Sequence, residues 1–281
     1  MLTILEIIKK TTEFFEKRGV DSARLNAELL VGHALGLKRM QLYIQFERPL
    51  SETELDKIRP LVKRRGNREP LQYILGTMEF AGLILKVDRR ALIPRPETEY
   101  LIECLVQRFP IHPLRVLDLG TGMGAIALAL AKAWPEANFF AIDRSEEALI
   151  LARENALSTG LNARISFQLS DWFSALPNQD KFDLIVSNPP YLSDEEVTAA
   201  EPEVRDFEPH EALSAGHDSA VALEHIIRGA RNRMTAGGCL VLETGIAHYL
   251  RLQQLLQAEG YKTCESLKDL TGRDRFVLAT L

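Results

Sequence analysis

The sequence predicts an α/β fold in which a seven-stranded, doubly wound sheet follows a small helical domain. In residues 1–75, apolar side chains recur at helical spacing. From residue 114 onward, strand-length apolar runs alternate with helix-length amphipathic stretches. The 281 residues are long enough for one α/β domain of ordinary size and one accessory domain. We expect a helical domain over residues 1–75, a β-hairpin linker over 76–96 and the main domain over 97–281.

The N-terminal helices are predicted from periodicity and from their end signals. Apolar residues fall at three- and four-residue steps over residues 5–15, and Gly19 follows as a stop signal. Ser51 and Glu54 stand three apart, which is the spacing of a capping box at the start of a helix. Residues 78–87 then favour a β-hairpin that turns near Ala81 and Gly82.

The main domain contains seven runs that are typical of strands. They span residues 114–119, 138–142, 164–169, 182–187, 239–244, 261–266 and 275–280. The run over 182–187 is nearly all apolar, as expected for a parallel strand that is buried on both faces.

Asn188-Pro189-Pro190-Tyr191 follows this buried strand and is the most informative stretch of the chain. Neither proline can donate to a sheet ladder, so the strand must stop there and Asn188 is held at a rigid exit. In an open α/β sheet this exit is where ligands bind. A primary amide, a free backbone carbonyl and a phenol ring suit a planar, neutral –NH₂ group. In isolation the same four residues could also be a simple turn.

A glycine-rich turn after the first strand predicts a nucleotide-like cofactor. Asp118-Leu119-Gly120-Thr121-Gly122-Met123-Gly124 leads into a helix, and Asp143 ends the second strand, where a carboxylate can bind ribose hydroxyls. NAD and S-adenosylmethionine both contain such a ribose. S-adenosylmethionine has no pyrophosphate and carries an ammonium and a sulfonium, so additional acids favour it.

Asp118, Asp171 and Trp172 are the candidates for such additional contacts. Asp118 lies beside the glycine turn, where it can face the cofactor or order the turn through backbone amides. Asp171 can accept from an adenine amino group and Trp172 can cover the ring, although Trp172 could instead pack beneath a loop.

Together these residues predict methyl transfer to a planar nitrogen. Hydrogen bonds from the –NH₂ group to the Asn188 side-chain oxygen and the Pro189 carbonyl would favour a pyramidal nitrogen and stabilise its developing positive charge. No strong base is then required, which agrees with the absence of a nearby histidine in the sequence.

Composition excludes several other classes of protein. The net charge of −5 argues against broad nonspecific nucleic-acid binding. No apolar run reaches the ~18–20 residues of a membrane span and the N-terminus lacks a signal-peptide core, so we expect a cytoplasmic protein. Cys104, Cys239 and Cys264 are widely spaced, which indicates neither a disulfide framework nor a metal site.

The chain resembles the release-factor glutamine methyltransferases, the PrmC/HemK family, over essentially its whole length. Besides the Asn188 motif and the glycine turn, the resemblance rests on Leu92-Ile93-Pro94-Arg95-Pro96-Glu97-Thr98-Glu99, Glu208-Pro209, Ala212-Leu213 and Gly272-Arg273-Asp274-Arg275. These enzymes methylate the side-chain amide of the glutamine in the Gly-Gly-Gln loop of class 1 peptide-chain release factors. The resemblance implies a Rossmann-like class I methyltransferase sheet, S-adenosyl-L-methionine as cofactor and S-adenosyl-L-homocysteine as product.

The resemblance also implies roles for individual residues. Gly120, Thr121, Gly122, Met123, Gly124 and Asp143 would contact the cofactor, Trp172 would lie near its adenine, and residues 188–191 would bind the glutamine, with Asn188 also close to the cofactor. The N-terminal domain would grip the release factor.

Several alternatives remain open from the sequence. Arg95, Glu97 and Glu99 could bind substrate or form an ion-paired start to the helix that Pro96 opens. The basic residues Lys63, Arg64, Arg65 and Arg68 could contact an acidic release-factor surface or lie at a solvated helix end.

Two other functions compete with glutamine methylation. An amino methyltransferase for adenine in DNA or guanine in RNA is disfavoured, because no large insertion and no basic, aromatic-rich stretch is present. A noncatalytic adaptor is the other alternative. We expect a monomer.

Overall fold

The computed structural model describes residues 2–281, which form two compact units. One unit contains residues 2–77 and a later segment, Glu201–Phe207. The other contains Met78–Ala200 and Glu208–Leu281. The contribution of Glu201–Phe207 to the helical unit is not evident from the sequence.

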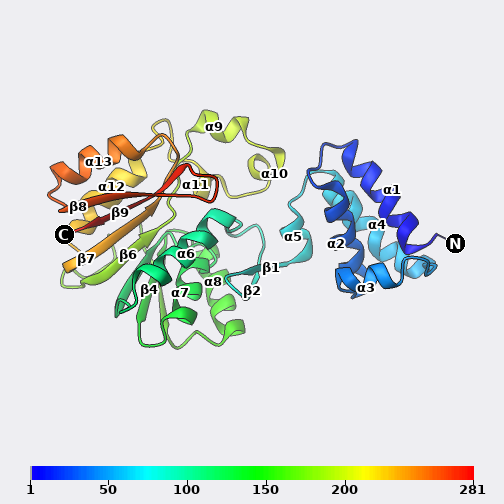
Figure 1. Ribbon diagram of the computed structural model, residues 1–281, viewed down its shortest axis with the longest axis horizontal. Coiled ribbons are helices and arrows are strands. Elements are labelled where there is room, and N and C mark those ends of the chain that lie inside the picture. Colours follow the sequence, from blue (N-terminus) through cyan, green and yellow to red (C-terminus); the bar gives the residue numbers. More distant parts are fainter. Residues whose placement is uncertain (1) are drawn as a thin grey trace. The chain divides into compact units, whose positions relative to one another are not determined.

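The first unit is a small helical bundle (Figure 1). Its helices are α1 (Ile4–Glu16), α2 (Ala23–Leu35), α3 (Arg39–Ile44), α4 (Glu52–Gly66), α5 (Leu71–Leu75) and α10 (Pro202–Arg205). The predicted capping box is confirmed, because the Ser51 side chain accepts from Glu54 N and Glu54 accepts from Ser51 N at 2.9 Å. Ile8, Phe15 and Leu30 are almost fully buried in its core.

Arginine side chains from α4 and the following turn hold Glu201–Phe207 in this unit. Arg65, whose side chain is only 7% exposed, donates to Glu203 at 2.8 Å. Arg68 donates to the same carboxylate at 2.6 Å and to Glu201 at 2.8 Å. Arg65, Arg68 and Glu203 are largely buried charges, which are stable only when they are paired.

Most of the basic residues in the run 63–68 have partners within the helical unit. Arg64 donates twice to the Glu69 carboxylate, each time at 2.8 Å, while Arg65 and Arg68 are occupied by Glu203. Since three of these four cations are engaged within the unit, the run is not a free basic surface for an acidic partner.

The hairpin predicted near Ala81 and Gly82 is confirmed. Strands β1 (Thr77–Phe80) and β2 (Leu83–Lys86) pair, and both turn residues have positive φ, 48° and 67°. Two consecutive residues with positive φ match the twist of a tight hairpin.

The second unit is a mixed seven-stranded sheet covered by helices (Figure 1). The strands are β3 (Arg115–Leu119), β4 (Asn138–Asp143), β5 (Ile165–Leu169), β6 (Phe182–Ser187), β7 (Met234–Glu243), β8 (Thr263–Lys268) and β9 (Asp274–Thr280). The helices are α6 (Pro96–Arg108), α7 (Ala125–Ala133), α8 (Glu146–Thr159), α9 (Asp194–Ala199), α11 (His210–Leu213), α12 (Val221–Arg231) and α13 (Tyr249–Ala258).

The strand order is β5-β4-β3-β6-β7-β9-β8, with β9 antiparallel to both of its neighbours. Strand β3 pairs in parallel with β4 on one side and with β6 on the other. The chain therefore changes direction across the sheet between β3 and β6, and ligands bind at such a switch point beyond the carboxyl ends of the strands.

The register brings the ends of four strands to one edge. Leu119 pairs with both Ile142 and Ser187, and Asp143 pairs with Leu169. The residues that follow these strands therefore leave the sheet at the same level.

Among residues 2–281, no helix combines the length and the apolar character that crossing a membrane requires.

Candidate active site

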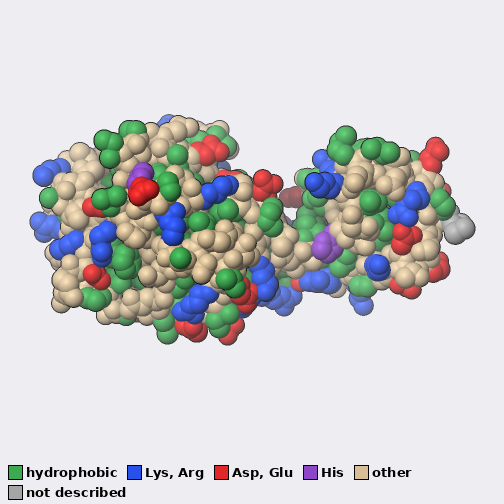
Figure 2. Space-filling view, turned by 90° about the horizontal axis from the view of Figure 1, so that it is seen from below, with side chains coloured by type: hydrophobic (Ala, Val, Ile, Leu, Met, Phe, Trp, Pro, Cys, Tyr) green, Lys and Arg blue, Asp and Glu red, His purple; other side chains and the backbone are tan. Residues whose placement is uncertain are grey.

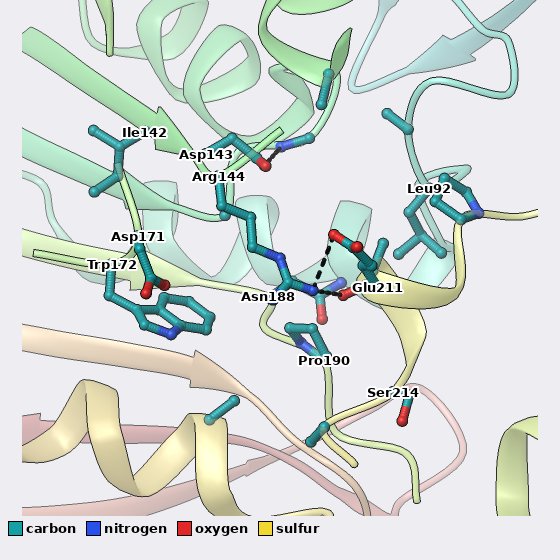
Figure 3. Close-up of a pocket in the computed structure, with 18 of the residues that line it drawn as sticks. Leu92, Ile142, Asp143, Arg144, Asp171, Trp172, Asn188, Pro190, Glu211 and Ser214 are labelled. Carbon is teal, nitrogen blue, oxygen red and sulfur yellow. Dashed lines mark hydrogen bonds and ion pairs between the residues drawn. The ribbon is translucent and has the colours of Figure 1, made fainter. Parts of the chain in front are cut away.

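A cavity of about 510 Å³ lies at this edge of the sheet (Figure 3). The predicted site residues that line it are Gly120, Gly122, Asp143, Asp171, Trp172, Asn188 and Pro190. They come from the ends of β3, β4, β5 and β6, so residues up to about 70 positions apart in the chain share one cavity. The switch-point geometry thus places the glycine turn and the Asn188 motif together.

The glycine turn is held against Asp143. Gly120 and Gly122 have φ of 69° and 57°, which side chains with a Cβ rarely adopt. The Asp143 carboxylate accepts from Gly122 N at 2.8 Å and from Ser145 N at 2.9 Å. Burial raises the pKa of Asp143, while these backbone donors oppose the shift. Each oxygen retains accepting capacity toward a ligand hydroxyl.

Asp118 lies outside the cavity lining and is fully buried. One of its oxygens, Oδ2, accepts from Thr121 Oγ1 at 2.6 Å and from Ala127 N at 3.1 Å, while Oδ1 has no hydrogen-bond partner among residues 2–281. Desolvation raises the pKa of Asp118 to about 7. These contacts favour the interpretation that Asp118 orders the glycine turn.

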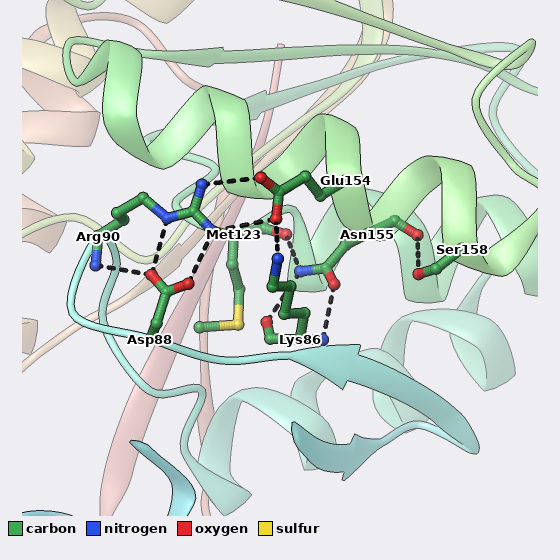
Figure 4. A network of polar contacts seen from close by, with 7 residues as sticks. All are labelled: Lys86, Asp88, Arg90, Met123, Glu154, Asn155 and Ser158. Carbon is green, nitrogen blue, oxygen red and sulfur yellow. Dashed lines mark hydrogen bonds and ion pairs between the residues drawn. The ribbon is translucent and has the colours of Figure 1, made fainter. Parts of the chain in front are cut away.

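Thr121, Met123 and Gly124 likewise do not line the cavity, and all three are buried. Their backbone shapes the turn. The Met123 carbonyl oxygen accepts from Asn155 Nδ2 at 3.1 Å, and the same amide holds both backbone polar groups of Lys86 (Figure 4).

Trp172 forms a wall of the cavity beside Asp171 (Figure 3). Its φ of 46° is in the left-handed region, which costs of order 1–3 kcal/mol and persists only where the surrounding structure holds the residue in place. Ser170 Oγ donates to the Trp172 carbonyl at 2.7 Å, and Phe173 is buried in the core below. Trp172 thus packs against the core and faces the cavity at the same time.

Asn188 is half-buried, and a hydrogen bond from its side-chain amide holds it in place. Its Nδ2 donates to Thr98 Oγ1 at 3.2 Å, and Thr98 donates to Glu243 at 2.7 Å. Pro189 is buried, whereas Pro190 lines the cavity. The Tyr191 hydroxyl donates to Glu243 at 3.2 Å; Tyr191 is not among the residues that line this cavity.

Arg95 and Glu97 also lie outside the cavity lining. Pro96 is the first residue of α6, as expected, and Glu97 lies in the first turn. Arg95 donates to Glu208 at 2.7 Å, and Glu208 also accepts from Ile93 N at 3.1 Å. This ion pair ties the segment before α6 to the loop that supplies the wall residues following Glu208.

The structure adds residues that the sequence did not single out. Arg144, which follows Asp143, extends to α11 and donates to the Glu211 carbonyl at 2.9 Å (Figure 3). His225 on α12 lines the cavity, with its ring centroid 6.4 Å from that of Trp172. The expectation that no histidine lies near the site is therefore wrong, because α12 is distant in sequence and folds back over this edge. Nothing in the local sequence marks either residue.

Comparison with known proteins supplies the family. Residues 6–76 match the PrmC N-terminal domain, and residues 112–274 match a methyltransferase domain. A release factor glutamine methyltransferase of Geobacter sulfurreducens is 42% identical over 275 residues, covering 98% of this chain and 95% of that protein. One from Escherichia coli is 39% identical over 258 residues, covering 92% of each. The chain belongs to the release factor glutamine methyltransferase family.

Solved structures agree with the family's fold. The hMettl16 catalytic domain in complex with MAT2A 3′UTR hairpin 6 has a TM-score of 0.58 at 18% identity, covering 78% of this chain and 81% of that one. A T. thermophilus 16S rRNA N2 G1207 methyltransferase in complex with AdoMet and guanosine has a TM-score of 0.53 at 22% identity, covering 73% and 49%. At these identities the likeness shows the fold alone, and it confirms the class I methyltransferase sheet.

The cavity fits the cofactor of this family. S-adenosylmethionine offers hydroxyl, ammonium and amino donors around an apolar ring, and the cavity offers the carboxylates of Asp143 and Asp171 beside the Trp172 indole. A side chain at Gly120 or Gly122 would be strained, because both have positive φ. The bare backbone there leaves room for a ligand against the turn.

Proposed function

We propose that this protein transfers a methyl group from S-adenosyl-L-methionine to the side-chain amide nitrogen of the Gly-Gly-Gln glutamine in class 1 peptide-chain release factors. One observation carries the proposal: the Asn188 amide lies at the edge of the same cavity as the Asp143-bound glycine turn. The family membership supplies the substrate class, since relatives named release factor glutamine methyltransferase match nearly the whole chain.

The cofactor would be held by residues at the carboxyl ends of β3, β4 and β5. When bound, S-adenosyl-L-methionine supplies an activated methyl group on its sulfonium. Asp143 would accept from ribose hydroxyls, Asp171 would accept from the adenine amino group, and Trp172 would cover an adenine face. Thr121, Met123 and Gly124 would contribute backbone shape, and Asp118 would order the turn.

The substrate amide would be held by Asn188 and Pro189. Both N–H groups of the glutamine –NH₂ would donate, one to Asn188 Oδ1 and one to the Pro189 carbonyl oxygen, which favours pyramidal geometry at nitrogen. The same two oxygens would stabilise the positive charge that develops there. A general base is not needed, because the methylated nitrogen carries an acidic proton that leaves to water.

The remaining substrate contacts come from neighbouring groups. Pro190 lines the cavity, and the Tyr191 ring would close over the glutamine side chain from the same strand exit. Arg95 and Glu97, at the start of α6, would act on the release-factor loop, Arg95 through its pair with Glu208.

We further propose that the helical unit grips the release factor outside the reacting loop. Its residues 6–76 match the PrmC N-terminal domain, and α3 exposes Met40 and Ile44, which are 72% and 82% exposed. These two side chains lie four residues apart on one helix and so share a face, and contiguous exposed apolar patches mark protein contact sites.

We also propose that the enzyme works as a cytoplasmic monomer and takes no nucleic-acid substrate directly. Lys and Arg side chains mix with Asp and Glu on the face shown in Figure 2, without a continuous basic surface there. The net charge of −5 supports the same view.

Transfer of labelled methyl to purified acceptors tests this function. The acceptors are a class 1 release factor with its Gly-Gly-Gln glutamine intact, the same factor with that glutamine replaced by alanine, DNA and ribosomal RNA. Label on the intact factor alone is expected. Label on nucleic acid would move the chemistry to a base, and label nowhere, with cofactor bound, would favour an adaptor.

A further inference from the structure

A buried hydrogen-bonded chain connects Asn188 to the end of a neighbouring strand. Asn188 Nδ2 donates to Thr98 Oγ1, Thr98 donates to Glu243 Oε2, and the Tyr191 hydroxyl donates to Glu243 Oε1. Thr98 and Glu243 are 3% and 1% exposed. Both carboxylate oxygens of Glu243 are therefore directed at groups that lead to the Asn188 motif.

The direction of every hydrogen in this chain follows from Glu243. Thr98 donates its single hydroxyl hydrogen to Glu243 Oε2, and the other carboxylate oxygen of Glu243 accepts from the Tyr191 hydroxyl. The Thr98 oxygen can then only accept from Asn188, which draws the Nδ2 end of that amide inward. The oxygen end of Asn188 is left free for another donor.

If the oxygen and nitrogen of the Asn188 amide were exchanged, its side chain could not accept a hydrogen bond from the substrate amide. If Thr98 donated to Asn188 Oδ1, the –NH₂ of Asn188 would take the place of its oxygen. Two –NH₂ groups, one from Asn188 and one from the glutamine, would then meet without an acceptor between them. The choice between the two orientations decides whether Asn188 can accept at all.

We propose that Glu243 is a positioning residue that, through Thr98, keeps the Asn188 side-chain oxygen turned toward the reacting amide. The inference rests on the proposed function and deepens it. Glu243 touches neither reacting atom. It acts as the fixed acceptor at the end of the chain, and through Oε1 it also fixes the Tyr191 hydroxyl.

The placement of Glu243 is costly for a residue with a purely structural role. A buried carboxylate loses its hydration, and this desolvation raises the pKa of Glu243. Arg275 on β9 favours its charged form and Glu97 on α6 opposes it. An apolar side chain would pack at this strand end without that cost.

The test compares methyl transfer to the release factor by wild type, Glu243→Gln, Thr98→Val and Thr98→Ser. Gln at position 243 and Val at position 98 keep the shapes of the native side chains, but they no longer fix the direction of the hydrogen bonds between Asn188, Thr98 and Glu243. Ser at position 98 retains the hydroxyl group. We expect kcat to fall about 10- to 100-fold in Glu243→Gln and Thr98→Val, less than the loss of a whole preorganised polar contact. Thr98→Ser should stay within about threefold of wild type. The Kd for S-adenosylmethionine should change less than about twofold in all of them.

Two further variants sharpen the comparison. Glu265→Gln, on β8, makes the same substitution in a half-exposed pair with Arg108 of α6 and should leave kcat unchanged. The double variant Thr98→Val/Glu243→Gln should have a kcat only slightly lower than that of either single variant, because both substitutions interrupt the same series of hydrogen bonds.

The outcomes separate this inference from the proposed function. An inactive wild type would overturn the proposed function and this inference with it. An active wild type with unchanged kcat in Glu243→Gln would overturn this inference alone. If Glu243→Gln does not bind cofactor, the two Thr98 variants decide: loss in Thr98→Val with retention in Thr98→Ser supports the role of the chain, and equal activity in both overturns it.

Discussion

Asn155 Nδ2 donates to the Met123 carbonyl oxygen at 3.1 Å, so a helix side chain fixes the last part of the glycine turn. Asn155 is fully buried, and it also accepts from Lys86 N at 2.7 Å and donates to Lys86 O at 3.1 Å (Figure 4). One amide therefore joins the turn to strand β2. The wall of the cavity that follows β2, including Arg90, is held by the same helix through Glu154.

Replacing Asn155 by leucine should loosen the cofactor site. Leucine has a similar size but leaves the buried Met123 carbonyl and the part-buried backbone groups of Lys86 without their partner, and a buried unsatisfied group costs roughly 1–3 kcal/mol. We expect a free energy of unfolding lower by about 2–4 kcal/mol and about tenfold weaker binding of S-adenosylmethionine, measured by urea unfolding and calorimetry. Ser158→Ala on the same helix is the control, and equal effects in both variants would contradict the role of Asn155.

Asp143→Asn should weaken cofactor binding more than the loss of one charge suggests. Both Asp143 oxygens accept a backbone N–H, from Gly122 and from Ser145, so an amide –NH₂ must face one of these donors. We expect a Kd for S-adenosylmethionine raised about 10- to 100-fold, which corresponds to about 1.4–2.8 kcal/mol. Calorimetry measures this Kd, and Asp56→Asn, which removes the charge of an exposed acid on α4, is the control. A change below threefold would show that Asp143 is not a cofactor contact.

Asn188→Ala should reduce turnover while it largely spares cofactor binding. The substitution removes the acceptor proposed for the glutamine amide, and the loss of one preorganised polar contact costs on the order of 10²–10³ in rate. Transfer of labelled methyl at saturating cofactor and release factor measures kcat directly. Asn162→Ala, at an exposed position, should behave as wild type. Unchanged turnover in Asn188→Ala would remove Asn188 from the mechanism.

The sequence predicts the sheet and the main site motifs well because both have local causes. Positive φ at Gly120 and the stop imposed by Pro189 and Pro190 are properties of a few adjacent residues. The seven strands can likewise be predicted from the length and the apolar character of their sequence segments. The carboxyl ends of β3, β4, β5 and β6 meet at one edge because these four strands run parallel.

The rest of the site depends on contacts that no local pattern encodes. His225 reaches the cavity only because α12 folds back over this edge, and Thr98 meets Glu243 from a helix 145 positions away in the chain. The segment Glu201–Phe207 belongs to the helical unit because Arg65 and Arg68 provide charge partners. Such pairings depend on tertiary packing, so sequence spacing cannot reveal them.

Asp118 should make the stability of the cofactor-free protein depend on pH. Its pKa is about 7 in the folded protein and 3.8 as a model value. The folded state therefore retains a proton that the unfolded state has lost. The contribution of this proton is complete below about pH 4 and disappears as the pH rises to about 7, at up to about 1.4 kcal/mol per pH unit.

Comparison with Asp118→Asn isolates this effect. Acids with lowered pKa values, such as Asp218 and Asp269, titrate alike in both proteins and cancel in the difference. Relative to the variant, wild type should lose stability between pH 5 and pH 7 in urea unfolding experiments. Parallel stability curves for the two proteins over this range would show that Asp118 is ionised in the folded state.

Breaking the Arg65–Glu203 pair should release Glu201–Phe207 from the helical unit. Arg65 and Glu203 have side chains only 7% and 18% exposed, so Glu203→Gln leaves a buried guanidinium without its charge partner. Removing one member of a buried pair costs about 3–5 kcal/mol. We expect a lower free energy of unfolding and faster proteolysis within this segment, followed by mass spectrometry.

Glu201→Gln supplies the matched control for that prediction. The Glu201 side chain is 71% exposed and also pairs with Arg68, and an exposed pair contributes only about 0–1 kcal/mol. The two substitutions lie two residues apart in one segment and make the same chemical change, so any difference between them reports burial. Equal protection of the segment in both variants would show that apolar contacts, not the Arg65 pair, hold it in place.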